Sequence, residues 1–280
     1  MKFGYVYPGG DAREAAQMAR LAEESGWDGF FVWDPVWGVD AWVTLAAAAV
    51  QTQKIRLGTM ITPVSRRRPW KLASETAALD RLSEGRLILA VGLGAIDTGF
   101  IQFGEITDRR QRAELLDEGL AILTGLWQGQ PFQFDGKHYH VNKTDFLPPP
   151  PPIQQPRIPI WVVGAWPRPK SMRRVVKFDG LLPDMIDDQG KHIRPTPLDI
   201  QYMLEYIQIN RDLDTPFDIV MEGDTSQENP DSARDIVREW AGAGVTWWLE
   251  AQWSLTETMW DPKTQGKISQ RLRLGPPHIV

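Results

Sequence analysis

Polar, aromatic and small residues follow directly after a series of apolar, strand-like segments in this sequence. These positions are Tyr7, Trp33, Asp34, Thr59, Met60, Thr62, Gly92, Gly94, Gly164, Ala165 and Trp166. Few of these side chains titrate near neutral pH. The combination is typical of a pocket that holds a planar heterocycle by stacking and backbone hydrogen bonds, with a cofactor performing the reaction. Because the chain has thirteen tryptophans, we expect some of them to line that pocket.

Two side chains are candidates for proton transfer. Asp34 follows the second apolar segment, where its carboxylate could face a cofactor or only cap the next turn. His192 ends an acidic loop, residues 183–192, and could swing over the pocket as a proton donor. The simplest interpretation of that loop is nevertheless an ordinary surface loop.

Two basic groups could bind a phosphate. Arg168 and Lys170 stand at the start of a predicted helix, whose N-terminus would add to their positive charge. Arg66 to Arg68 form a second group in the loop after the third segment. Exposed arginines and lysines are usually only solvated, so both interpretations remain open.

Composition excludes several kinds of site. The chain has no cysteine, and therefore no disulfide, thiolate zinc site or cysteine nucleophile. The pair His138 and His140 has metal-ligand spacing, but it falls in a predicted hairpin without a carboxylate at useful spacing. A polar hairpin face explains the pair better, and the sequence predicts no metal site.

The overall charge bears on partners and location. The chain has 31 basic and 36 acidic residues, a net charge of −5, which disfavours binding to nucleic acid or anionic membranes. The first residues, MKFGYVYPGG, run straight into a strand, and the longest apolar run, residues 45–50, is too short to cross a bilayer. These features favour a soluble cytoplasmic protein.

The elements that must position these residues alternate between strand and helix. Strands are predicted at residues 3–7, 29–34, 55–64, 87–94, 158–166, 179–185, 217–224 and 245–253. Eight such units in 280 residues predict an α/β fold, a (β/α)8 TIM barrel, with a hairpin insertion at 132–141 and a polyproline connector at 148–159. An open doubly wound sheet is the alternative, although neither of its two best-known phosphate-binding motifs is present.

One long stretch, VTLAAAAVQTQKIRLGTMITPVSRRRPWKLASETAALDRLSEGRLILAVGLG, resembles the luciferase-like monooxygenase superfamily. The segments RAELLDEGLAILTGLWQG, FDGKHYHV, PPPPIQQPRIPIWVVGA and KFDGLLP support the resemblance. It implies one barrel domain over residues 1–280 and a flavin-dependent oxidoreductase that binds reduced FMN or coenzyme F420 at the carboxyl ends of the strands. It also implies a non-prolyl cis peptide within Thr59-Met60-Ile61, and a coenzyme side chain that passes near Gly164 and Ala165.

The resemblance leaves the acid–base groups unassigned. Pro35 stands where many F420-dependent members have a histidine, Ala95 stands where dehydrogenases have a glutamate, and the following loop lacks the arginine that holds the FMN phosphate in luciferases. We therefore expect a monooxygenase that uses FMN, with F420 left open. A flavin-binding relative without turnover and a metal-dependent barrel hydrolase are the alternatives. A small-molecule substrate is expected, together with a flavin reductase and a homodimer formed through residues 40–52.

Overall fold

The computed structural model describes residues 1–145, 149–189, 191–226 and 228–277. Along the chain the elements are β1 (Lys2–Tyr7), α1 (Ala12–Glu24), β2 (Gly29–Val32), α2 (Ala41–Gln51), β3 (Arg56–Thr59), β4 (Thr62–Pro63), η1 (Val64–Arg66), α3 (Pro69–Leu82), β5 (Leu87–Gly92), α4 (Arg109–Gln128), β6 (Phe132–Asp135), β7 (His140–Thr144), β8 (Ile160–Trp166), α5 (Pro169–Val175), β9 (Gly180–Ile186), β10 (His192–Ile193), α6 (Pro197–Asn210), β11 (Asp218–Gly223), α7 (Pro230–Gly242), β12 (Trp247–Ala251), η2 (Trp253–Thr258) and α8 (Pro262–Arg273).

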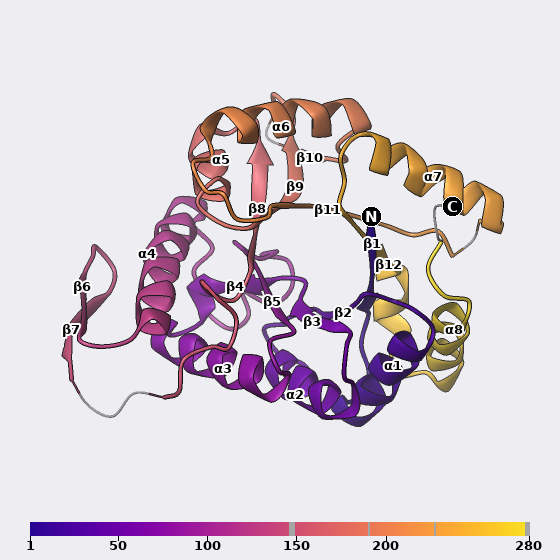
Figure 1. Ribbon diagram of the computed structural model, residues 1–280, viewed down its shortest axis with the longest axis horizontal. Coiled ribbons are helices and arrows are strands. Elements are labelled where there is room, and N and C mark those ends of the chain that lie inside the picture. Colours follow the sequence, from indigo (N-terminus) through magenta and orange to yellow (C-terminus); the bar gives the residue numbers. More distant parts are fainter. Residues whose placement is uncertain (146–148, 190, 227, 278–280) are drawn as a thin grey trace.

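Parallel strands close into a barrel that helices surround (Figure 1). Within the described residues, eight strands follow one another in the order β1, β2, β3, β5, β8, β9, β11 and β12, and β12 pairs with β1. The short strands β4 and β10 add to β5 and β9. The predicted TIM barrel is therefore confirmed, and the open sheet is excluded because the first and last strands are hydrogen-bonded.

Local signals set the ends of the helices. Asp11 accepts hydrogen bonds from the backbone N–H groups of Arg13 and Glu14, and the Glu14 side chain bonds back to the Asp11 N–H. Gly26 follows the end of α1 at φ +85°, a conformation that suits glycine. These two local features fix where α1 begins and where it ends.

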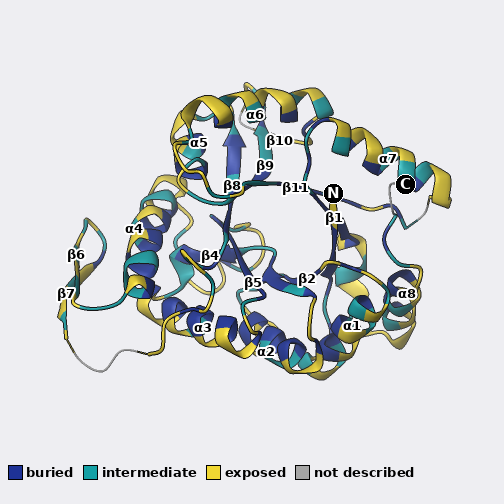
Figure 2. Cartoon of the chain, in the orientation of Figure 1, coloured by how far each residue is buried: buried dark blue, intermediate teal, exposed yellow. Residues whose placement is uncertain are grey.

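The barrel interior is closed at its amino end by aromatic side chains. Phe31 stacks on Trp161 with 5.4 Å between ring centroids, and Trp247 lies 5.3 Å from Trp161. Trp247 pairs with Lys2 at the first residue of β1, which places this aromatic plug at the amino ends of the strands. The strands are buried and the outer helix faces are exposed (Figure 2).

The two predicted insertions are present. Strands β6 and β7 form an antiparallel hairpin beside α4 (Figure 1), and Tyr139 from its turn packs against Leu115 of α4. The described part of the proline-rich connector is held by Asp80 of α3, whose carboxylate accepts hydrogen bonds from the N–H groups of Ile153 and Gln154 at 2.7 and 3.1 Å. Residues 146–148 lie outside the described residues.

Among the described residues, no helix combines the length and the hydropathy needed to cross a membrane.

Candidate functional site

A cavity of about 530 Å³ opens at the carboxyl ends of β8, β9, β11 and β12, beside the end of β3. It is lined by Met60, Val163, Leu182, Pro183, Asp184, Ile193, Arg194, Pro195, Val220, Met221, Glu222, Gly223, Asp224, Ala251 and Trp253. Its position agrees with the rule that barrel enzymes react at the carboxyl ends of their strands. Of the cofactor-binding residues predicted from the sequence, Met60 lines this cavity.

Met60 belongs to a bulge that interrupts the third predicted strand. The Met60–Ile61 peptide bond is cis, as predicted, and it separates β3 from β4. The Met60 N–H donates to the carbonyl of Val32 at 2.7 Å, which ties the bulge to the neighbouring strand. The structure therefore presents this bulge to the cavity at the place where the sequence predicted contact with a cofactor ring.

Thr59 and Thr62 hold the bulge from behind. Both were candidates for contact with the cofactor, and both are fully buried. The Thr62 hydroxyl donates to the Thr59 hydroxyl at 2.9 Å, and the Thr59 hydroxyl donates to the carbonyl of Ala90 at 3.2 Å. The chain changes direction between the two threonines, so their side chains meet instead of alternating.

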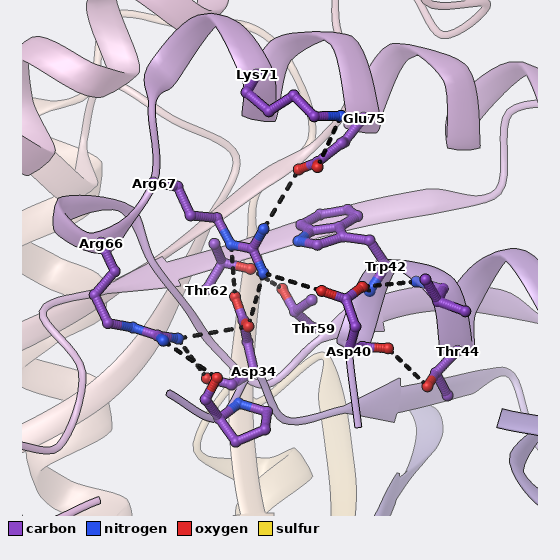
Figure 3. Close-up of polar contacts among 12 residues, drawn as sticks. Asp34, Asp40, Trp42, Thr44, Thr59, Thr62, Arg66, Arg67, Lys71 and Glu75 are labelled. Carbon is purple, nitrogen blue, oxygen red and sulfur yellow. Dashed lines mark hydrogen bonds and ion pairs between the residues drawn. The ribbon is translucent and has the colours of Figure 1, made fainter. Parts of the chain in front are cut away.

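Asp34 is engaged by arginines (Figure 3). Its carboxylate accepts hydrogen bonds from Arg67 Nε at 3.0 Å and Arg67 Nη2 at 2.9 Å, and its backbone carbonyl accepts from Arg66 Nη2 at 2.7 Å. Glu75 lies 3.4 Å from the same Arg67. The network fastens the loop before α3 to the end of β2, which is a structural role for Asp34.

The predicted phosphate-binding group, Arg66 to Arg68, is already engaged by other residues. Arg66 and Arg67 are both committed to Asp34, and the guanidinium of Arg68 lies 5.9 Å from the ring of Trp70. A phosphate at this loop would have to compete with a buried carboxylate. The group therefore serves the fold in this structure.

Gly92 and Gly94 have packing reasons to be glycine. A Cβ on Gly92 would lie 2.4 Å from Ile61 Cδ1 and 2.9 Å from Val163 Cγ2, so this glycine makes room for the bulge. Gly94 adopts φ +78°, and its carbonyl accepts a hydrogen bond from Arg112 at 2.9 Å. Close approach of a cofactor to either backbone stays a prediction.

The three residues of the predicted segment Gly164-Ala165-Trp166 contact other parts of the protein and do not line the cavity. A Cβ on Gly164 would meet Leu181 and residues of α5, so this glycine faces the helix layer. Ala165 is buried, and its N–H donates to the Ser171 hydroxyl at 2.9 Å. The Trp166 ring packs edge-on to Tyr206 at 5.9 Å, outside the cavity lining.

Tyr7 and Trp33 also lie outside the cavity lining. The buried Tyr7 ring packs in the layer between strands and helices, and its hydroxyl donates to Gln265 of α8 at 3.1 Å. The Trp33 indole donates to the carbonyl of Pro8 at 3.0 Å. Neither residue is brought to the surface that Met60 helps to form.

The cavity is lined by more ionisable groups than expected. Trp253 is the indole that lines the cavity among the described residues, together with Asp184, Arg194, Glu222 and Asp224. Other tryptophans fill the amino end of the barrel or the layer beneath the helices. A large buried ring packs equally well in any of these layers, so tryptophan count alone does not indicate a pocket.

Glu222 is a cavity-lining residue to which the sequence analysis assigned no role. It lies near the end of β11, and the indole N–H of Trp253 donates to its Oε2 at 3.2 Å. Burial raises the pKa of Glu222, while the Trp253 hydrogen bond and the charge of Arg194 act in the opposite direction. The available signal was a glutamate two residues after a buried valine in a strand, which alternation directs into the barrel mouth.

His192 lies at the rim of the cavity. Its Nδ1 is 2.7 Å from Asp184 Oδ1, and its side chain is 71% exposed. His192 and Ile193 form β10, and β10 pairs with the end of β9. Part of the predicted surface loop therefore belongs to these two strands. Gly190 of that loop lies outside the described residues. A proton-donor role for His192 stays a prediction.

The pair His138 and His140 belongs to the polar side of the hairpin. Contrary to expectation, each has a carboxylate partner, Glu114 of α4 at 2.9 Å and Asp135 at 2.5 Å. In the described ranges, no group of three or more histidine, aspartate or glutamate side chains is arranged to hold a metal ion. The two imidazoles take part in separate contacts.

A basic edge lies beside the site. Burial and the like charges of Arg168, Arg112 and Arg174 lower the pKa of Arg109, which begins α4. Arg112 and Arg174 are held by backbone carbonyls and Asp117, whereas the side chains of Arg109 and Arg168 form no hydrogen bond or ion pair with other described residues. Arg168, which the sequence predicted as a phosphate-binding residue, therefore lies close enough to Arg109 of α4 for the two positive charges to interact.

The family profile described as luciferase-like monooxygenase matches residues 1–196, more than half of the chain. This chain belongs to the luciferase-like monooxygenase family. A curated relative, the F420-dependent glucose-6-phosphate dehydrogenase of Gordonia bronchialis, is 31% identical over 170 residues. That match covers 56% of this chain and 48% of the relative, so the chain aligns with about half of the relative's length.

Solved structures share the fold of this luciferase-like protein. The coenzyme F420-dependent tetrahydromethanopterin reductase of Methanopyrus kandleri has a TM-score of 0.75 at 19% identity, over 100% of this chain and 99% of that one. The oxygenating constituent of 3,6-diketocamphane monooxygenase from Pseudomonas putida, solved with FMN, has a TM-score of 0.73 at 17% identity, again over 100% and 99%. Relatives of this chain therefore use F420 or FMN.

Proposed function

We propose that this luciferase-like protein is an oxidoreductase that holds the ring of reduced FMN or F420 against the Met60–Ile61 bulge. The observation that carries the proposal is the cavity that opens beside this bulge at the carboxyl end of the barrel. Its volume falls within the range of about 300–1,000 Å³ that is typical of small-molecule sites. When bound, the cofactor supplies the reducing electrons, to dioxygen in a monooxygenase or directly to a substrate.

The residues present fit a group of this kind. Met60, Val163, Leu182, Val220 and Ala251 form an apolar wall that can cover a flat ring and exclude water. Arg109 and Arg168 at the adjoining edge are free to pair with a cofactor phosphate. We propose that the ring lies on the apolar wall and that the phosphate lies at this basic edge.

The charged residues that line the cavity restrict which substrates can bind there. Three carboxyl-bearing residues and one arginine line the cavity, namely Asp184, Glu222, Asp224 and Arg194. An anionic substrate would meet mostly like charge there. We propose a small uncharged or cationic substrate, in contrast to the phosphate ester named for the Gordonia relative.

Equilibrium titration with FMN, riboflavin and F420 tests the cofactor. Saturable binding at micromolar concentration supports the proposal, and no binding of either cofactor refutes it. Arg168→Gln should weaken FMN more than tenfold and leave riboflavin, which lacks the phosphate, unchanged. The exposed Arg238→Gln serves as the matched control. Equal weakening of both ligands by Arg168→Gln would refute the phosphate position.

Rapid mixing separates an enzyme from a binding protein without turnover. The protein loaded with its reduced cofactor is mixed with air, or with small ketones under nitrogen. A monooxygenase should consume oxygen in a substrate-dependent way, and an F420-dependent reductase should oxidise its cofactor only when an acceptor is added. Cofactor oxidation no faster than in free solution under both conditions would favour the non-catalytic relative.

A further inference from the structure

Glu222 brings a carboxyl group to the inner side of the barrel mouth. It lies two residues after Val220, whose side chain belongs to the barrel interior, and alternation along β11 puts both on the same face. Both residues line the cavity that Met60 also lines. A ligand in this cavity is therefore within reach of the Glu222 carboxyl group.

The two oxygens of Glu222 have different surroundings. Oε2 accepts a hydrogen bond from the indole N–H of Trp253 at 3.2 Å. Oε1 has no hydrogen-bond partner among the residues that the structure describes. The indole thus orients the carboxyl group and leaves one oxygen available to a ligand.

The surroundings of Glu222 favour its protonated form. Burial raises its pKa, because an ionised carboxylate loses solvation among Val220, Ala251 and the other apolar lining residues. The charged groups nearby are Arg194, which lowers the pKa, and the carboxylates of Asp184 and Asp224, of which Asp184 is paired with His192. Glu222 therefore keeps its proton to a higher pH than an ordinary glutamate does.

Of the other positions considered for acid–base work, His192 is paired with Asp184 at the exposed rim of the cavity, and the remaining three offer no available proton-transfer group. Pro35 and Ala95 cannot exchange protons. Asp34 is paired with Arg66 and Arg67 and does not line the cavity. An oxidoreductase of this family that protonates its substrate needs such a group elsewhere in the mouth.

We propose that Glu222 is the acid–base residue of this site and acts on a small uncharged ketone or α,β-unsaturated ketone. This inference rests on the proposed function. When bound, the reduced cofactor would supply a hydride, with its two electrons, to the substrate carbon, and the C=O π pair would move to oxygen, through the conjugated C=C bond where the substrate is an enone. The oxygen takes the proton from Glu222 Oε1. The resulting carboxylate is stabilised by Trp253 and Arg194 and regains its proton from solvent at the open mouth.

A titration that needs no substrate is the first test. Side-chain carboxyl carbons of ¹³C-glutamate-labelled full-length protein are followed by NMR as the pH rises. One glutamate should titrate clearly above the ordinary value of about 4.3. That signal should vanish in Glu222→Gln and persist in Glu205→Gln, which changes an exposed glutamate of α6. A titration in which every glutamate stays in the ordinary range would overturn the proposal.

Single-turnover kinetics with 2-cyclohexen-1-one is the second test. Glu222→Gln should slow cofactor oxidation by about 10²–10⁴-fold, the usual contribution of general acid catalysis, with cofactor Kd within about twofold. The wild-type rate should fall as pH rises through the Glu222 pKa, and Glu222→Asp should restore part of it. A Glu222→Gln rate within about threefold of wild type, or no wild-type reaction with this ketone, would overturn the proposal.

Failure of the proposed function is distinguishable from failure of this inference. If neither FMN nor F420 binds to the wild-type protein, the proposed function fails. If a cofactor binds equally to wild type and Glu222→Gln and both react at the same rate, the proposed function survives and the role of Glu222 is refuted.

Discussion

Replacement of Asp34 by alanine should weaken the fold more than it weakens cofactor binding. The Asp34 side chain is 3% exposed, and its carboxylate lies 2.9 Å from one arginine and 3.5 Å from another. Asp34→Ala leaves the guanidinium groups of Arg66 and Arg67, whose side chains are 8% and 19% exposed, without their buried anion. An unpaired buried charge is costly because it has neither water nor a counter-ion.

The expected loss follows from the contacts that remain. Removal of one partner from a buried ion pair costs about 3–5 kcal/mol. Arg67 keeps Glu75 at 3.4 Å, and Arg66 keeps two backbone carbonyls, so we expect the lower end, about 3 kcal/mol. With an unfolding entropy of about 2.1 cal/mol/K per residue, a chain of 280 residues should then melt about 5 °C lower.

Urea unfolding followed by circular dichroism measures this loss. Asp34→Asn keeps the shape of the side chain but removes its charge, and it should lose nearly as much stability as Asp34→Ala. Asp235→Ala, the matched control, removes an exposed partner of Arg238 and should cost less than about 1 kcal/mol. An Asp34→Ala protein of wild-type stability that binds its cofactor tenfold more weakly would refute this reasoning and support direct contact between Asp34 and the cofactor.

Three further predictions concern the bulge, the hairpin and assembly. Gly92→Ala should push Ile61 into the mouth and weaken cofactor binding, measured by titration, and shortening residue 61 to alanine in the same protein should restore it. Hydrogen bonds from Lys137 and His138 lower the pKa of Glu114 to about 2. The contact between the hairpin and α4 is therefore present above pH 4.5 and should be lost as the pH falls toward 2, which hydrogen exchange can measure. Glu114→Gln should remove this pH dependence. If the exposed Val50 of α2 lies in a homodimer, Val50→Glu should give a monomer in light scattering, and an unchanged mass would contradict this.

The element order was readable from the sequence. Alternating apolar segments and helix caps such as Asp11 act over short distances along the chain, and the predicted strands and helices agree with the structure apart from short segments and ends. The cis bond at Met60–Ile61 was also predicted, but from the family resemblance. Closure of the barrel followed from the number of units, because eight parallel strands in one sheet can bury both faces by joining first to last.

The composition of the site was much less readable. Of the eleven positions that were assigned a cofactor-binding role, Met60 lines the cavity. Strand direction alone does not say which residues face inward, and the bend at the bulge brought Thr59 and Thr62 together behind the mouth. Glu222 was assigned no role because a single glutamate near a strand end has no motif around it.

The sequence alone therefore determined the barrel, its two insertions and its family, since repeated local patterns specify them many times over. Only the tertiary structure decided that Asp34 is held by arginines and that Glu222 shares a cavity with Met60. These outcomes depend on side chains from strands and loops far apart in the chain, and on which face of each strand turns inward. Burial and charge at such meeting points arise from the packed fold, so no short segment of sequence contains them.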